Sequence, residues 1–157
     1  MIRRATPADV PHIVACIRAL ADYERLSHEC EADEVRLREH LFGATPFCHA
    51  LIAEDDGVPV GFALWHFAYS TFKASPCLHL EDLFVFPDRR GKGFGLALLR
   101  AVAAEAVQRG CARLGWNVLD WNEPAIRFYQ AQGAEVLPDW RTCRLAGAAL
   151  RRVASLS

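Results

Sequence analysis

The chain has 157 residues, enough for one domain with a core of its own, and we expect a single domain over residues 1–157. Apolar residues make up 52% of the sequence, which is typical of a globular protein and argues against a disordered one. The net charge of −1 argues against a general nucleic-acid binder, and no apolar run is long enough to cross a bilayer. Because Arg3 and Arg4 lead into a polar turn instead of a signal peptide, we expect a cytoplasmic protein.

The first half of the sequence combines helical and strand-like patterns. Apolar residues recur at helical spacing after Thr6-Pro7, a typical helix start, and a second, shorter helix is expected from Asp33. Asp55-Asp56-Gly57 separates two apolar runs and is typical of a hairpin turn. The predicted elements are a strand at residues 2–4, helices at 6–23 and 33–42, and an antiparallel meander of strands at 47–54, 58–69 and 77–86.

The segment Arg89-Arg90-Gly91-Lys92-Gly93-Phe94-Gly95 is the most informative part of the chain. It stands between an apolar strand and a helical pattern over residues 94–109, so it predicts a strand, a glycine-rich turn and a helix start in succession. Glycine lets the backbone approach a ligand closely, and the N–H groups at a helix start bind anions. The spacing matches neither a P-loop nor a dinucleotide fingerprint. The residues alone predict a phosphate or pyrophosphate site, with a basic turn that merely links strand to helix as the alternative.

The rest of the chain predicts a strand over residues 113–119, a helix from Asn122 to about Gln132, and two last strands over 135–137 and 141–145. The whole order is β-α-α-β-β-β-α-β-α-β-β, a mixed α/β layout. The histidines and cysteines show no metal-ligand spacing, so we expect no metal.

The motif Arg90-x-x-Gly93-x-Gly95 resembles the R/Q-x-x-G-x-G/A signature of the GNAT superfamily of acetyltransferases. Four further segments resemble its spermidine/spermine (diamine) and thialysine acetyltransferase branch: ADYE at 21–24, LEDLFV at 80–85, WNEPAIRFY at 121–129 and DWR at 139–141. The resemblance implies a GNAT fold, an α/β fold with a mixed, mostly antiparallel sheet flanked by helices. It also implies a homodimer that transfers acetyl from acetyl-CoA to a small primary amine by direct attack.

The same resemblance implies where acetyl-CoA binds. The glycine-rich turn would hold the pyrophosphate, the backbone N–H groups of residues 83–85 would hold the acetyl carbonyl, and Asn122 would contact the pantetheine arm while capping a helix. The implied cofactor-binding residues are Leu83, Phe84, Val85, Arg90, Gly91, Lys92, Gly93, Phe94, Gly95 and Asn122.

Two positions stand out as candidate catalytic residues. Tyr129 takes the place of the family's general acid toward the CoA thiolate. A phenol with a pKa of about 10 stays protonated at neutral pH and can donate its proton; the alternative is a core aromatic.

Glu81 and Asp82 interrupt an apolar strand, where carboxylates are costly unless they are solvated or paired. Because adjacent strand residues point to opposite faces, both can face one site only across a bulge. The resemblance implies that both bind the amine and that Glu81 assists its deprotonation; the alternative is that one carboxylate is functional while the other pairs with an arginine.

The resemblance also assigns Glu24 and Trp140 to the substrate side, with a solvated helix end and a packed indole as the plainer alternatives. Two stretches depart from the polyamine enzymes. Residues 130–132 (Gln-Ala-Gln) lack basic side chains, and residues 150–153 are basic where those enzymes are acidic. Since a polyamine prefers an acidic surround, a diamine or thialysine fits as well as a polyamine. A protein N-acetyltransferase and a non-catalytic CoA-binding module are the alternative functions.

Overall fold

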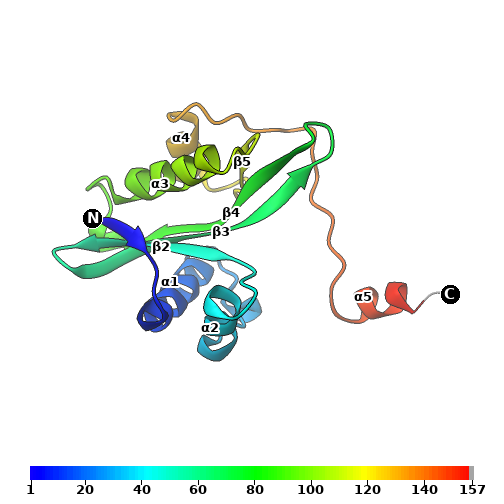
Figure 1. Cartoon of the computed structure of the whole chain (residues 1–157), viewed down its shortest axis with the longest axis horizontal. Helices are drawn as coiled ribbons and strands as arrows, with labels where there is room; N and C mark the ends of the chain where they lie inside the picture. Colours follow the sequence, from blue (N-terminus) through cyan, green and yellow to red (C-terminus); the bar gives the residue numbers. More distant parts are fainter. Residues whose placement is uncertain (156–157) are drawn as a thin grey trace. The chain divides into compact units, whose positions relative to one another are not determined.

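The structure, a computed structural model, describes residues 1–155 (Figure 1). The chain forms two compact units, Met1–Asn117 and the part from Val118 onward. The first unit carries a five-stranded sheet with helices, and the described part of the second, up to residue 155, carries two short helices. Among residues 1–155, no helix combines the length and the apolar character needed to span a membrane. The expectation of a single domain stays a prediction.

The sheet of the first unit runs in the order β1-β2-β3-β4-β5. Its first four strands form the predicted antiparallel meander, and β5 pairs with β4 in parallel. Asp56 and Gly57 have φ values of 49° and 78°, the two positive angles that a tight hairpin turn between β2 and β3 requires. The strands are β1 (Ile2–Arg4), β2 (His49–Asp55), β3 (Val58–Ser70), β4 (Ser75–Val85) and β5 (Leu114–Gly115).

Helices cover both faces of this sheet (Figure 1). α1 and α2 lie on one face, and α3 lies on the other. Asp33, where the second helix was expected to begin, is the N-cap of α2, because its Oδ1 accepts a hydrogen bond from the Arg36 N–H at 2.9 Å. The helices are α1 (Val10–Tyr23), α2 (Glu34–Phe42) and α3 (Phe94–Gln108), with short 3-10 turns η1 (Pro7–Asp9), η2 (Ser27–Glu29) and η3 (Pro87–Arg89).

The sheet face under α1 and α2 holds a hydrophobic core. Ile13 of α1 packs with Phe62 and Leu64 of β3 and with Phe84 of β4. Complete burial of one such side chain stabilises the fold by about 1.5–3 kcal/mol. Because side chains alternate along a strand, this core fixes which residues of β3 and β4 face α1 and α2.

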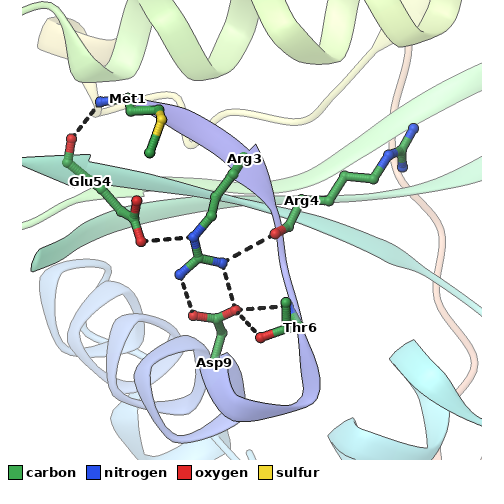
Figure 2. Close-up of polar contacts among 6 residues, drawn as sticks. All are labelled: Met1, Arg3, Arg4, Thr6, Asp9 and Glu54. Atoms are coloured by element: carbon green, nitrogen blue, oxygen red, sulfur yellow. Dashed lines mark hydrogen bonds and ion pairs between the residues drawn. The ribbon is translucent and has the colours of Figure 1, made fainter. Parts of the chain in front are cut away.

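Arg3 ties β1 to β2 and to the turn before α1 (Figure 2). Its guanidinium donates to both carboxylate oxygens of Asp9, at 2.7 and 2.8 Å, and its Nε donates to Glu54 Oε1 at 2.7 Å. Asp9 Oδ2 also accepts from the N–H and the hydroxyl of Thr6. The helix start predicted at Thr6 is therefore held by the Asp9 side chain, which satisfies groups that the first turn leaves unpaired.

The second unit departs from the sequence prediction. It holds α4 (Glu123–Gln130) and α5 (Gly147–Ala154), and α5 was not predicted. The strands predicted over 135–137 and 141–145 are wrong, since no sheet ladder forms there within the described residues. A strand needs a partner for its backbone groups, and Pro138 lacks an N–H between the two segments. The strand predicted over 113–119 is also too long, because only the two residues of β5 pair with β4.

Candidate active site

The glycine-rich turn has the geometry that the sequence predicts. Gly91 and Gly93 adopt φ values of 77° and 85°, and Gly93 is the N-cap of α3. Apart from the glycine itself and its two chain neighbours, no residue has a heavy atom within 4 Å of a Cβ built on either glycine, so the space beside the turn is open. The first N–H groups of α3, which include those of Phe94 and Gly95, have no acceptor within the helix. A backbone with these donors and this open side is suited to an anion.

The basic side chains of the turn are engaged within the protein. Arg89 Nη1 and Lys92 Nζ each lie 3.1 Å from Asp55 Oδ2. The hydrogen bond from Lys92, and then that from Arg89, hold the pKa of Asp55 below its usual range. Arg90 Nε donates to the Val85 carbonyl at 2.9 Å, which joins the turn to the end of β4. The backbone N–H groups are therefore the fixed donors of the turn, and Arg90 positions it.

The end of β4 has one edge that β5 does not cover. β5 pairs with β4 at Leu78 and His79, and the ladder stops there. The N–H of Phe86, just after β4, donates to the Val60 carbonyl of β3. Because N–H groups alternate between the two edges of a strand, that of Phe84 points toward β3, and those of Leu83 and Val85 point to the uncovered edge. Of the three residues predicted to hold the acetyl carbonyl, Leu83 and Val85 have suitably directed donors.

A β-bulge at Glu81 interrupts the ladder between β3 and β4. Leu64 pairs with Asp82 and Trp65 pairs with Leu80, so Glu81 has no partner of its own. A bulge adds one residue to a strand and redirects the side chains beside it. Asp82 faces α1 and α2, because its partner Leu64 belongs to the core under those helices. Glu81 reaches the same face, as the next contacts show.

Two histidines that the sequence analysis missed lie beside Glu81. His66 Nε2 is 3.6 Å and His79 Nε2 is 3.8 Å from Glu81 Oε2. His66 and His79 are partners across the β3–β4 ladder, and their ring centroids are 5.1 Å apart. His66 follows Leu64 by two residues, so both point to the face of α1 and α2. Glu81 and Asp82 therefore share one face, across the bulge that such an arrangement requires.

Glu24, Glu81 and Asp82 form an acidic cluster. Removal from water, followed by the charges of Glu81 and Glu24, raises the pKa of the half-buried Asp82 to about 7. Burial raises the pKa of Glu24, which lies just after α1. The bulge places Glu81 beside Asp82, and the charge of Glu24 also acts on Asp82. Such a cluster attracts a cation, and a carboxyl with a pKa near 7 exchanges protons at neutral pH.

The remaining predicted residues belong to the second unit. Asn122 is buried and caps α4, its Oδ1 accepting the Ala125 N–H at 3.4 Å. Tyr129 is half-buried near the end of α4, with its ring centroid 5.1 Å from that of Phe128. Trp140 is 78% exposed. The roles of Asn122, Tyr129 and Trp140 in acetyl transfer stay predictions.

Comparison with known proteins identifies the family. Residues 13–134 match the acetyltransferase (GNAT) family. The chain belongs to this family. It is 41% identical to a thialysine N-epsilon-acetyltransferase of Bos taurus, over 98% of this chain and 96% of that protein. It is 35% identical to an L-ornithine N5-acetyltransferase of Arabidopsis thaliana, over 99% of this chain and 88% of that one.

The solved structures agree with this assignment. An integron cassette protein of V. cholerae superposes with a TM-score of 0.81 at 27% identity, over 99% of this chain and 98% of that one. The predicted GNAT fold, with its mostly antiparallel sheet and flanking helices, is confirmed. This GNAT protein is an acetyltransferase, and its family implies acetyl-CoA as the acetyl donor.

Proposed function

We propose that this GNAT acetyltransferase transfers acetyl from acetyl-CoA to a primary amine of a small diamine or thialysine-like substrate, by direct attack. Relatives that align with nearly the whole chain are named for the acetylation of thialysine and of L-ornithine. Both are small amino acids that carry a second amine. A polyamine belongs to the same chemical class and stays within the proposal.

The acidic cluster of Glu24, Glu81 and Asp82 is the observation that carries this proposal. A small diamine is cationic at neutral pH, and three neighbouring carboxylates attract such a cation. The amine must lose a proton before it attacks the acetyl carbon, and a carboxylate accepts that proton directly or through water. We assign ammonium binding to all three residues and assistance in deprotonation to Glu81.

Acetyl-CoA is assigned to the glycine-rich turn, the start of α3 and the end of β4, all in the first unit. The glycine-rich turn and the start of α3 supply backbone N–H groups for the pyrophosphate. Leu83 and Val85 supply N–H groups at the uncovered edge of β4 for the acetyl carbonyl, where they would stabilise the developing negative charge. Tyr129 is proposed as the acid that protonates the leaving thiolate.

A substrate panel tests the proposal. Acetylated product would be measured by mass spectrometry with acetyl-CoA and thialysine, ornithine, lysine, a short diamine, spermidine or a lysine-containing peptide. We expect the highest kcat/KM for one of the small amines. A clear preference for the peptide would indicate a protein N-acetyltransferase. Tight CoA binding with no turnover on any amine would indicate a CoA-binding module.

Glu81→Gln is the companion variant, with Glu29→Gln as its matched control on an exposed surface turn. The first should raise the KM for the amine, and the second should leave it unchanged. The homodimer and the cytoplasmic location stay predictions. Light scattering of the purified chain over a range of concentrations would test the former.

A further inference from the structure

The pair of histidines beside Glu81 is not explained by acetyl transfer. His66 and His79 lie opposite each other on two paired strands, and both Nε2 atoms are turned to one carboxylate oxygen. The three candidate donor atoms all lie within 4.8 Å of one another. The side chains of His66, His79 and Glu81 are 39%, 29% and 57% exposed, so a solute from water can reach all three.

The hydrogen bonding of His66 determines which of its ring nitrogens is available. Its Nδ1 lies 3.2 Å from the Phe67 carbonyl oxygen. A carbonyl oxygen only accepts, so Nδ1 carries the proton, and the neutral ring keeps its lone pair on Nε2. That nitrogen lies 3.6 Å from the Glu81 oxygen, so one cation between them could bind both.

We propose that His66, His79 and Glu81 bind a divalent transition-metal ion of the zinc class. Two imidazole nitrogens and one carboxylate oxygen are a common ligand set for Zn²⁺, with water in the fourth position. The Nδ1–H···O=C bond of His66 is the outer contact that orients a metal-binding histidine. Ligands about 2.1 Å from a tetrahedral ion lie about 3.4 Å apart. The two nitrogen–oxygen distances, 3.6 and 3.8 Å, are only slightly longer.

This site has a consequence for acetyl transfer, which rests on the proposed function. Glu81 is assigned to the ammonium group of the substrate, so a metal ion on Glu81 and the amine exclude each other. Bound metal therefore inhibits the enzyme in competition with the amine and not with acetyl-CoA. The expectation of no metal rested on ligand spacing along the sequence, and this site is assembled across a hairpin.

Cobalt is the probe for the site itself. The full chain would be freed of metal with a chelator and titrated with Co²⁺, followed by the visible d–d absorption of the ion. We expect one equivalent to bind with the intense bands of a tetrahedral site. The chain has six free cysteines, and burial, followed by the nearby charge of Glu81, raises the pKa of the Cys48 thiol. A near-ultraviolet thiolate-to-cobalt band would show cysteine ligation and overturn the proposed ligand set.

His66→Phe and His79→Phe should each weaken cobalt binding at least about 100-fold, since the loss of even an outer partner costs 10–100-fold. Phenylalanine keeps a planar ring and suits a strand, and circular dichroism would verify the fold. His28→Ala is the matched control, because His28 Nε2 lies 3.8 Å from Glu29 Oε1 without a second histidine. Equal binding by the wild type and both phenylalanine variants would refute the site.

A second measurement separates the site from its effect on catalysis. Initial rates would be measured with and without Zn²⁺ by mass spectrometry of the acetylated amine, since free CoA thiol itself binds zinc. Zinc should raise the KM of the amine in the wild type and much less in His66→Phe, each relative to its own metal-free rate. Cobalt binding without zinc inhibition would leave the metal site standing and refute the assignment of Glu81 to the amine. If no amine is turned over, the cobalt titration still decides the site.

Discussion

Replacing Arg3 with methionine should destabilise the first unit by about 3–5 kcal/mol at pH 7, the usual effect of removing one partner of a buried ion pair. The Arg3 guanidinium is shared by two carboxylates that are almost fully buried, Asp9 at 6% and Glu54 at 8% exposure (Figure 2). Methionine keeps much of the length of the side chain and supplies no charge. The variant therefore leaves two buried carboxylates without their cation, which is costlier than the loss of the contacts alone.

The size of the loss should depend on pH. In the wild type, the hydrogen bonds from Arg3 hold the pKa of Asp9 well below its usual range. This stabilisation is complete above the ordinary aspartate pKa of about 3.9 and is lost as the pH falls toward the folded-state value. In the variant, burial without the cation raises the pKa of Asp9. On acidification the carboxyl therefore takes up a proton, and the free-energy cost of burying an unpaired negative charge disappears. The difference in the free energy of unfolding between the wild type and the variant should therefore be smaller at pH 4 than at pH 7.

Urea unfolding at both pH values is the assay, with the free energy of unfolding obtained by linear extrapolation. Arg18→Met is the matched control, because the Arg18 guanidinium donates to the carbonyl of Ala32 at an exposed position; it should cost less than about 1 kcal/mol. The variant Arg3→Met with Asp9→Asn should recover part of the loss. A loss below about 1 kcal/mol at pH 7, or an equal loss at both pH values, would refute the reasoning.

Three further predictions concern the proposed active site. Gly93→Val puts a β-branched residue at φ 85° in the cofactor turn and should raise the KM for acetyl-CoA strongly; Gly110→Val, with comparable strain at φ 65° beyond α3, should not. Glu81→Gln in chelator-treated enzyme should impair turnover most at low pH, where more of the amine is protonated, and a pH–rate profile equal to that of the wild type would contradict its role. Tyr129→Phe should lower kcat by about 10²–10⁴-fold with little change in thermal stability, and a folded variant with near-normal kcat would make Tyr129 a packed aromatic.

Local sequence rules predicted the features that depend on neighbouring residues. The glycine turn at 91–93 needs positive φ values that glycine supplies without strain, so its position could be predicted from the residues themselves. The sequence named the bulge as a requirement, because adjacent strand residues point to opposite faces and Glu81 and Asp82 can face one site only if the strand gains a residue. The charge pairs of the turn were missed, because Asp55 lies 37 residues before Lys92 and contacts it only in the fold.

Features set by long-range pairing were predicted poorly. The last strands were expected from apolar residues such as Val136 and Leu145, but a strand also needs a ladder partner, and composition does not provide one. His66 and His79 were missed because they are 13 positions apart and meet only through the register of β3 and β4. Pairing the two predicted strands about the turn at residues 71–74 would have placed His66 and His79 opposite each other.

The arrangement around β4 explains how one short segment can serve both reactants in the proposed function. Backbone N–H groups lie in the plane of a sheet, and side chains stand perpendicular to it. In that function, the N–H groups of Leu83 and Val85 would hold the acetyl carbonyl from the edge, while Glu81 and Asp82 would hold the amine from the face. A nucleophile attacks a carbonyl carbon from outside the carbonyl plane, which this right angle favours. The bulge is essential to this geometry, because without it Glu81 would point to the face of α3 and the amine would lose one of its carboxylates.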